Sequence, residues 1–286
     1  MRTHPFLLIN PRSGSGSPSA DELVQAARER WIEAHLLEPG DDPRELALRS
    51  GAEIVGIAGG DGSLAPVAAA ALETGARFVC IPFGTRNHFA RDAGLDRDDP
   101  LAALAAFDAG REERIDIGRV GGRLFLNNVS LGAYAGLVHR REHHRRRGET
   151  LARAKALLAV ARQRHRLHAR VDGEDTDARV ILVGNNRYEL DLFTLGARAR
   201  LDAGTLDLWA AAGWWPTEWA ERVAPTFRIE LPGPRAAVAI DGEPALLEPP
   251  FELESLAGAL RLLVPERTAE KDDDRRGDAR KSPRNG

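Results

Sequence analysis

Three short turns within the first ninety residues combine glycine with side chains that bind phosphate. They read INPRSGSGS (residues 9–17), AGGDGS (58–63) and IPFGTRNHFA (81–90), and each one ends an apolar, strand-like run. Glycine-rich turns bind anions through backbone N–H groups, and hydroxyl and amide side chains add further donors. In open parallel sheets, ligands bind beyond the carboxyl ends of the strands. The three turns together therefore predict a phosphate-binding cradle.

The common nucleotide-binding motifs do not account for these turns. The sequence contains no G-x-x-x-x-G-K-[ST], which excludes a P-loop nucleoside triphosphatase. Residues 60–65 match G-x-G-x-x-A, but a dinucleotide site needs an acidic residue about 20 positions later to hold a ribose. Residues 74–91 contain no Asp or Glu, so the sequence disfavours a dinucleotide-dependent dehydrogenase.

A fourth segment, Asp241-Gly242-Glu243, lies far downstream of the three turns. In order and spacing, the four segments resemble the diacylglycerol-kinase-like lipid kinases, particularly the soluble bacterial members. The matching stretches are Asn10–Gly14, Gly59–Ser63, Pro82–Asn87 and Asp241–Glu243, and the resemblance extends to about Pro265. One such turn alone would be a weak signal, whereas four in the same order are specific.

The resemblance implies an ATP site in a cleft between an α/β domain and a β-sandwich domain. It implies that Asp61 lies at the Mg²⁺–phosphate centre and that Asp241 or Glu243 takes the proton of a lipid hydroxyl, with these two carboxylates left as alternatives. Phosphoryl transfer requires charge neutralisation, in-line positioning and such a proton acceptor. The residues expected to bind ATP or support its turns are Asn10, Ser13, Gly14, Gly59, Gly60, Gly62, Ser63, Gly84, Thr85 and Asn87.

Simpler interpretations exist for the same residues. Asn10-Pro11 is also typical of a plain turn, Asp61 of a helix cap, and Asp241-Gly242 of a hairpin turn. Two positions depart from the family pattern. His88 stands where bacterial members usually carry Asp, and histidine is a poor Mg²⁺ ligand. Ala203 replaces Asp in the D-G-x-L-D metal segment, which leaves Asp207 as its remaining candidate ligand.

The elements expected to position the turns alternate between strand and helix over residues 1–118. Apolar runs at Phe6–Asn10, Ile54–Ala58 and Phe78–Ile81 are typical of buried strands, and the last of them contains Cys80, the sole cysteine. Between them, helical spacing appears in residues 20–30 and in a segment that starts at Asp42-Pro43. Ser63 is expected to cap the helix after the second turn. This alternation predicts an α/β domain with a mainly parallel sheet.

Residues 119–265 change to short β-favouring runs, which predict an antiparallel sandwich or barrel as a second domain. The resemblance implies that this domain is a β-sandwich that binds the lipid substrate. A Gly121-Gly122 hairpin opens this region, and a basic helical insertion is expected from residue 149 to about 168. The runs FELE (251–254) and ALRLLVP (259–265) are expected as its last strands. Residues 266–286 contain no Leu, Ile, Val or Phe, which predicts a disordered tail.

Charge is concentrated in one segment. The whole chain of 286 residues has a net charge of −3, whereas residues 139–170 hold ten Arg and one Lys against two Glu, a local net charge of +9. Clustered cations attract anionic lipid headgroups. His139 and His143 could bind zinc only with further ligands, which the segment lacks. Nucleic-acid binding is not expected either, because no aromatic residues are interleaved with the cations. Four tryptophans within residues 209–219 are candidates for membrane or acyl-chain contact, with Trp209 expected to pack in the core instead.

These observations predict a cytoplasmic, peripherally membrane-associated kinase that transfers the γ-phosphoryl group of ATP to a lipid hydroxyl with Mg²⁺ as cofactor. No apolar run approaches the length of a membrane span. Diacylglycerol or a related lipid is the leading substrate. Two alternatives remain at this point: an NAD kinase, which shares the G-G-D-G turn, and a catalytically silent lipid- or nucleotide-binding protein.

Overall fold

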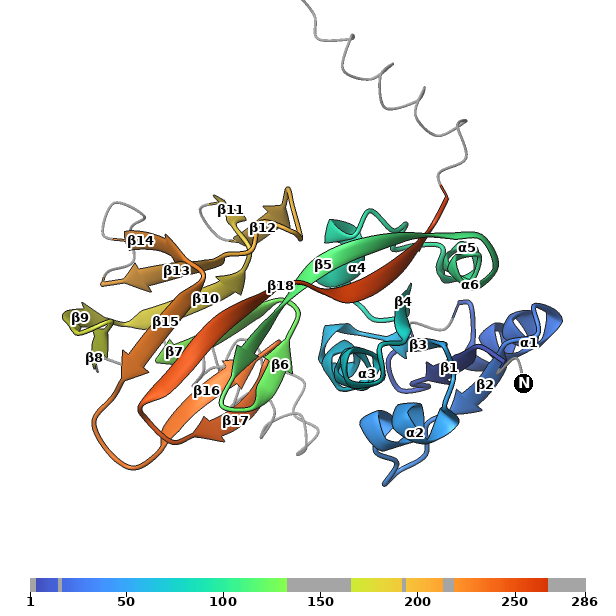
Figure 1. The fold of residues 1–286 in the computed structure, drawn as a ribbon, viewed down its shortest axis with the longest axis horizontal. Helices are drawn as coiled ribbons and strands as arrows, with labels where there is room; N and C mark the ends of the chain where they lie inside the picture. Colours follow the sequence, from blue (N-terminus) through green and yellow to red (C-terminus); the bar gives the residue numbers. More distant parts are fainter. Residues whose placement is uncertain (1–3, 15–16, 133–165, 192–193, 213–218, 267–286) are drawn as a thin grey trace, which may run out of the picture.

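The computed structural model describes residues 4–14, 17–132, 166–191, 194–212 and 219–266 of the chain. In this part of the molecule an α/β half and a strand-rich half lie side by side, and long strands connect them (Figure 1). Among the described helices, none is long and apolar enough to cross a membrane. Residues 149–165 of the expected basic helix, Trp214, Trp215 and almost all of the expected tail lie outside the described residues. The prediction that this helix extends to about residue 168 was wrong, because Leu167 and His168 begin a strand, β8 (Leu167–Val171), that pairs in a sheet.

Four parallel strands form the sheet of the α/β half, in the order β2-β1-β3-β4. Their bounds are β1 (Phe6–Ile9), β2 (Glu33–Leu36), β3 (Ile54–Gly59) and β4 (Arg77–Pro82). Both faces of the sheet are covered: Leu8 of β1 packs in one core, and Leu7 and Ile9 pack in the other. Such burial on both faces explains why these strands read as continuous apolar runs. Cys80 is buried in β4, as predicted.

Helices cover the two faces of this sheet. They are α1 (Ala20–Glu29), α2 (Pro43–Ser50), α3 (Asp61–Thr74), α4 (His88–Asp92), α5 (Pro100–Ala103) and α6 (Ala106–Ala109). The Asp42 carboxylate caps α2 and Pro43 is its first residue, as predicted. The prediction that Ser63 caps α3 was wrong. Gly60 is the N-cap, and the Ser63 N–H already donates to the Gly60 carbonyl within the first turn.

Two long strands connect the halves, β5 (Gly110–Val120) and β18 (Phe251–Pro265). They pair antiparallel, and the last residues of β18 also pair in parallel with β4. The two separate runs expected at residues 251–254 and 259–265 are in fact this single strand. Its register shifts between Leu256 and Leu260, where Gly258 adopts a φ of +58° that glycine tolerates. The C-terminal strand thus returns to the N-terminal sheet.

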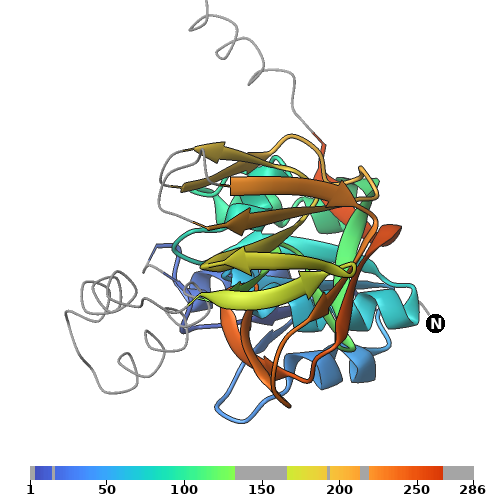
Figure 2. The same cartoon turned by 90° about the vertical axis from the view of Figure 1, so that its left-hand side faces the viewer.

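The strand-rich half consists mainly of two antiparallel layers (Figure 2). One continues the first sheet through β18, with β6 (Arg123–Phe125) paired to β5 and with β15 (Thr226–Glu230), β8 (Leu167–Val171) and β9 (Glu174–Ala178) beyond it. The other contains β14 (Trp219–Ala224), β13 (Leu206–Ala211), β10 (Val180–Asn185), β7 (Asn128–Gly132), β16 (Ala236–Ile240) and β17 (Glu243–Leu247). A separate hairpin pairs β11 (Tyr188–Asp191) with β12 (Thr194–Arg198).

One apolar core joins the two layers, with Phe125, Phe227 and Phe251 from one sheet against Val183 and Leu208 from the other. The fold class expected from the sequence is therefore confirmed: a mainly parallel α/β half and an antiparallel, sandwich-like half. The Gly121-Gly122 hairpin between β5 and β6 is also present. The domain boundary at residue 118 stays a prediction, because β5 and β18 contribute to the cores of both halves.

Candidate active site

A cavity of about 810 Å³ lies between the two halves. The α/β half supplies the three glycine-rich turns, and the strand-rich half supplies the Asp241–Glu243 turn and three polar residues. The lining residues are Asn10, Arg12, Ser13, Gly60, Asp61, Gly62, Ser63, Gly84, Thr85, Arg86, His88, Asn127, Asn128, Tyr188, Asp241, Gly242 and Glu243. Segments more than two hundred residues apart in the chain therefore meet at one site.

The three turns of the α/β half contact one another because their parallel strands end at the same edge of the sheet. The Asn10 amide donates to the Ser63 hydroxyl over 3.2 Å and links the first turn to the second. The second and third turns touch through their backbones: a Cβ added to Gly84 would lie 2.4 Å from the Gly60 Cα. Only glycine permits this approach. The turns thus expose their backbone and side-chain donors to one cavity.

Asn87 shapes the third turn from within and does not line the cavity. Its side-chain oxygen accepts from the Gly84 N–H at 2.8 Å, and its amide group donates to the Gly84 carbonyl at 2.9 Å. Asn87 itself has a φ of +48°, a left-handed conformation that Asn adopts more readily than most residues. Gly14 and Gly59 do not line the cavity either. A Cβ added to Gly14 would collide with the Phe83 ring, and a Cβ added to Gly59 would collide with Ser63.

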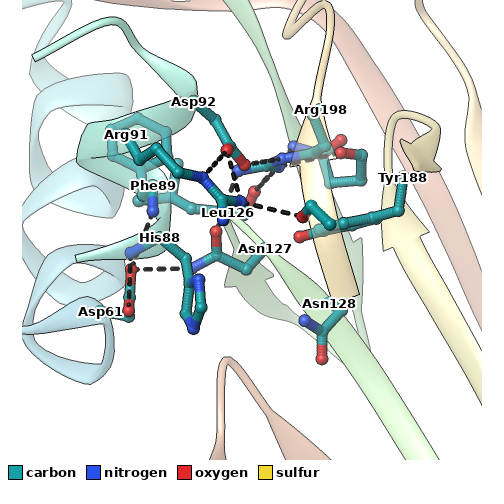
Figure 3. Close-up of polar contacts among 12 residues, drawn as sticks. Asp61, His88, Phe89, Arg91, Asp92, Leu126, Asn127, Asn128, Tyr188 and Arg198 are labelled. Atoms are coloured by element: carbon teal, nitrogen blue, oxygen red, sulfur yellow. Dashed lines mark hydrogen bonds and ion pairs between the residues drawn. The ribbon is translucent and has the colours of Figure 1, made fainter. Parts of the chain in front are cut away.

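Asp61 lies at the start of α3, yet its carboxylate is directed at a different helix (Figure 3). Its oxygens accept from the backbone N–H groups of His88 at 3.1 Å and Phe89 at 3.0 Å, which open α4. A third donor, the Asn127 side-chain amide, lies 3.4 Å from Oδ1. The simple interpretation of Asp61 as a cap of its own helix is therefore wrong, since the side chain binds α4 and faces the cavity.

His88 occupies the position where the family pattern has Asp, and its side chain is partly buried in the cavity wall. Burial lowers the pKa of the imidazole below its usual value, although the Asp61 carboxylate acts in the opposite direction. A lowered pKa leaves the ring mainly neutral at pH 7. Among the lining residues of the α/β half, Asp61 is the acidic one.

Asp241 is buried in the hairpin turn between β16 and β17, and its carboxylate is held by backbone groups. It accepts from the N–H groups of Leu126 and Asn127 at 2.8 Å and of Asn128 at 3.0 Å. Burial, with a smaller contribution from the charge of Asp61, raises the pKa of Asp241 to about 6 against the opposing effect of these three donors. Asp241 and Gly242 both have positive φ, as in a two-residue hairpin turn. The interpretation of Asp241-Gly242 as a hairpin turn is thus correct.

Glu243, two residues later, is exposed at the cavity wall. A Cβ placed on Gly62 would lie 2.6 Å from the Glu243 Oε1, so the carboxylate of the strand-rich half lies directly over the second glycine-rich turn of the α/β half. The absence of a side chain at Gly62 is what allows this contact. Of the two candidate proton acceptors, Glu243 is the one whose carboxylate is open to the cavity.

Asp207 does not join the cavity. It is buried in β13, where Oδ2 accepts from the Trp209 indole at 2.9 Å and from the Tyr188 N–H at 3.3 Å. Burial raises its pKa above the usual value. In the described part of the chain, no three His, Cys, Asp or Glu side chains are grouped as metal ligands. A metal-binding role for Asp207 stays a prediction.

Five lining residues were not singled out by sequence reasoning: Arg12, Arg86, Asn127, Asn128 and Tyr188. The two arginines were within reach of that reasoning, because each lies inside a glycine-rich turn. Asn127-Asn128 follows an apolar run and is a weaker signal. Tyr188 carries no local signal, since it is placed by the β11–β12 hairpin; burial raises its pKa to about 12.

Comparisons with known proteins agree with this arrangement. Residues 4–120 match the model of the diacylglycerol kinase catalytic domain. A protein of Klebsiella pneumoniae named "Probable lipid kinase YegS-like" is 29% identical over 307 residues, covering 93% of this chain and 98% of that protein. A Pseudomonas aeruginosa protein of the same name is 32% identical over 216 residues, covering 71% of this chain and 70% of its own length.

The fold is also similar to that of solved structures. A diacylglycerol kinase from Bacillus anthracis str. Sterne superposes with a TM-score of 0.67 at 17% identity and covers 92% of this chain and 97% of its own. At that identity the likeness shows the fold alone. The sequence relatives and the matched domain place this chain in the family of diacylglycerol-kinase-like lipid kinases to which the YegS-like proteins belong.

Proposed function

We propose that this protein transfers the γ-phosphoryl group of ATP to the hydroxyl group of a lipid. The observation that carries the proposal is the meeting of the three phosphate-binding turns with the Asp241–Glu243 turn in one cavity. A phosphotransferase needs a donor site and an acceptor site within bonding distance of each other. The two halves of the molecule supply one each.

The turns of the α/β half would bind the triphosphate. Backbone N–H groups at Gly60, Gly62 and Gly84, with the side chains of Asn10, Ser13, Ser63 and Thr85, provide uncharged donors. Arg12 and Arg86 are exposed at the same wall and add the positive charge that polyphosphates require. Gly14, Gly59 and Asn87 would contribute by shaping the turns.

The cavity also fits Mg²⁺ in the way that ATP-dependent enzymes commonly hold it. Mg²⁺ is usually bound by one or two carboxylates, phosphate oxygens and water, so it does not need a complete protein cage. Asp61 offers a carboxylate whose bonds to α4 and Asn127 leave further lone pairs for a cation. When bound, Mg²⁺ would neutralise charge on the phosphates, and the neutral His88 ring would not oppose it.

Glu243 would take the proton from the attacking hydroxyl group. Glu243 is exposed at the cavity wall and its carboxylate lies over Gly62, whereas the Asp241 carboxylate is buried against the backbone of residues 126–128. We assign Asp241 a positioning role: it fastens the β16–β17 turn to residues 126–128 and so places Glu243 opposite the phosphate turn. Diacylglycerol, or a lipid with a similar free hydroxyl, is the proposed acceptor.

The test is incubation with γ-labelled ATP, Mg²⁺ and a panel of lipids, with NAD as a further acceptor. The wild type and Asp61→Ala are compared, and Arg200→Gln serves as a control because its exposed pair with Asp202 lies outside the cavity lining. Labelled lipid with the wild type and the control, and none with Asp61→Ala, supports the proposal. Labelled NADP would identify an NAD kinase instead. Nucleotide binding without turnover of any acceptor would identify a silent binding protein.

A further inference from the structure

A fully buried ion pair joins the two halves behind the cavity wall. The Arg198 guanidinium, at the end of β12, and the Asp92 carboxylate, at the end of α4, both have completely buried side chains and lie 2.8 Å apart. The same guanidinium lies 5.1 Å from the centre of the Tyr188 ring. Isolating an ion pair from water is costly unless its remaining donors and acceptors are satisfied.

Further hydrogen bonds satisfy most of the Arg198 donors. Nη1 donates to the Leu126 carbonyl at 2.6 Å, and Nη2 donates to the Asn127 side-chain oxygen at 2.9 Å (Figure 3). Nη1 also donates to the Asn185 carbonyl at 2.9 Å. These acceptors lie on the segment after β6 and at the end of β10. One side chain therefore links four parts of the chain that converge at the cavity.

The contact with Asn127 has a directional consequence. A guanidinium has only donors, so the Asn127 oxygen must face Arg198 and its NH₂ group must face the other way. On that side lies the Asp61 carboxylate, 3.4 Å from the amide nitrogen. Without Arg198 the amide could rotate and present its oxygen to Asp61, which would repel the carboxylate. Arg198 thus selects the orientation in which Asn127 donates to Asp61.

The contact with Asp92 acts on Asp61 by a second route. α4 has only five residues, and its first two N–H groups are the ones that Asp61 accepts. Arg198 holds the other end of the same helix through Asp92, and Arg91 adds a bond from its Nη2 to the Gly196 carbonyl in β12. The β11–β12 hairpin of the strand-rich half therefore fixes the helix that holds the Asp61 carboxylate.

We propose that Arg198 is a positioning residue that sets the orientation of Asp61 for Mg²⁺–ATP, through Asn127 on one side and through Asp92 and α4 on the other. The proposal rests on the proposed function in assigning Asp61 to the nucleotide site. It adds that the acceptor half of the molecule controls the geometry of the donor half. If Arg198 only stabilised the fold, its replacement would affect stability without a selective effect on Asp61.

The experiment compares Arg198→Lys and Asn127→Ala with the exposed control Arg200→Lys. The first keeps a charge for Asp92 but loses the fork that reaches Asn127, and the second removes the amide while leaving the ion pair. Two quantities are measured: calorimetric binding of a non-hydrolysable ATP analogue with Mg²⁺, and hydrogen exchange of the His88 and Phe89 amides without ligand. Thermal unfolding is followed in parallel.

We expect both variants to bind the Mg²⁺–analogue about tenfold or more weakly than the wild type, a loss of about 1.4 kcal/mol or more. The amides of His88 and Phe89 should exchange faster, while those in the middle of α3 keep their protection. In a variant that combines Arg198→Lys with Asn127→Ala, the two effects on binding should not add, because both act through the Asn127 amide.

Folded variants with unchanged binding and unchanged exchange at residues 88 and 89 would overturn the proposal. If Arg198→Lys does not fold, Asn127→Ala still decides the matter, since it leaves the ion pair in place. If the wild type itself binds no ATP analogue, the proposed function fails, and the hydrogen exchange of His88 and Phe89 still tests the positioning of Asp61.

Discussion

The two carboxylates of the Asp241-Gly242-Glu243 turn have opposite environments although they are two residues apart. Asp241 is buried under three backbone donors, whereas Glu243 is open to the cavity. A residue that transfers protons must reach the substrate, and a residue that fixes a turn must be enclosed. This contrast is the reason that we propose Glu243 as the proton acceptor and Asp241 as the residue that fixes the turn, two roles that the sequence left as alternatives.

Replacing Glu243 tests its assignment as the proton acceptor. Glu243→Gln keeps the size of the side chain and removes its basicity, so turnover should fall by about 10²–10⁴-fold. Stability should change by less than about 0.5 kcal/mol, because the residue is exposed. The measurement is steady-state transfer of labelled phosphate together with binding of Mg²⁺–ATP, which should be retained. Wild-type turnover in this variant would return the role to Asp241.

The buried Asp241 carboxyl predicts a pH-dependent contribution to stability. Its pKa in the fold is about 6 against an ordinary 3.8, so between these values the folded protein holds a proton that the unfolded chain has released. The contribution is therefore complete below pH 3.8 and is lost as the pH rises through 6. Relative to Asp241→Asn, which does not titrate, the wild type should lose on the order of 3 kcal/mol over that interval.

The measurement is urea unfolding of both proteins from pH 4 to pH 7.5, without nucleotide or Mg²⁺. The unfolding free energy of the wild type minus that of Asp241→Asn should fall with rising pH and become constant above about pH 7. A difference that grows with pH would show that the three backbone donors, rather than burial, determine the pKa of Asp241.

At the scale of elements, the site depends on how closely the turns approach one another. Gly60 and Gly84 touch through their backbones, and Gly62 makes room for the tip of the Glu243 side chain. A backbone obstacle cannot move aside without displacing a whole turn, whereas a flexible side chain can rotate away. The two kinds of contact therefore predict different consequences for the same substitution, glycine to alanine.

Gly84→Ala should weaken nucleotide binding, because its Cβ would lie 2.4 Å from the Gly60 Cα and would push the second and third turns apart. Gly62→Ala should mainly reduce turnover, because its Cβ would displace the Glu243 carboxylate. Calorimetric binding of Mg²⁺–ATP and the kcat for lipid phosphorylation distinguish the two effects. Equal loss of binding in both variants would contradict this division of roles.

At the scale of the whole molecule, a lipid kinase must meet its substrate at a bilayer. The described end of the basic segment runs from Arg166 into β8, where its basic side chains lie next to acidic ones: Arg166 and His168 next to Asp177, and Arg170 next to Asp175 and Glu230. The charge available for a membrane must therefore come from residues 139–165, which lie outside the described residues. We propose that this part of the segment attracts the enzyme to anionic lipid.

Vesicle sedimentation at increasing salt tests that proposal. Replacing Arg140, Arg141, Arg145, Arg146 and Arg147 by Gln should abolish binding to vesicles that contain phosphatidylglycerol, at about 1 kcal/mol per cation. The matched control replaces Arg166 and Arg170, whose partners are acidic residues of the fold, and should bind as the wild type does. Binding that ignores both salt and anionic lipid would rule out electrostatic docking.

The sequence by itself predicted the alternation of strands and helices as far as β4, and the four segments that meet at the candidate site, but not the short helices α4, α5 and α6. These are local properties, since hydrophobic periodicity, caps and glycine turns act within a few residues. Even so, local reasoning misplaced the start of α3 and divided β18 in two, because tertiary contacts decide where an element ends and whether a bulged strand continues.

Only the tertiary structure decided where the candidate groups lie and what they contact. It directed Asp61 to α4, enclosed Asp241, opened Glu243 to the cavity and brought in Asn127, Tyr188 and Arg198. The partners in these contacts are far apart in the chain: 66 residues separate Asn127 from Asp61, and 106 separate Arg198 from Asp92. No local pattern records such pairings, because burial and hydrogen-bond geometry arise only when the two halves pack together.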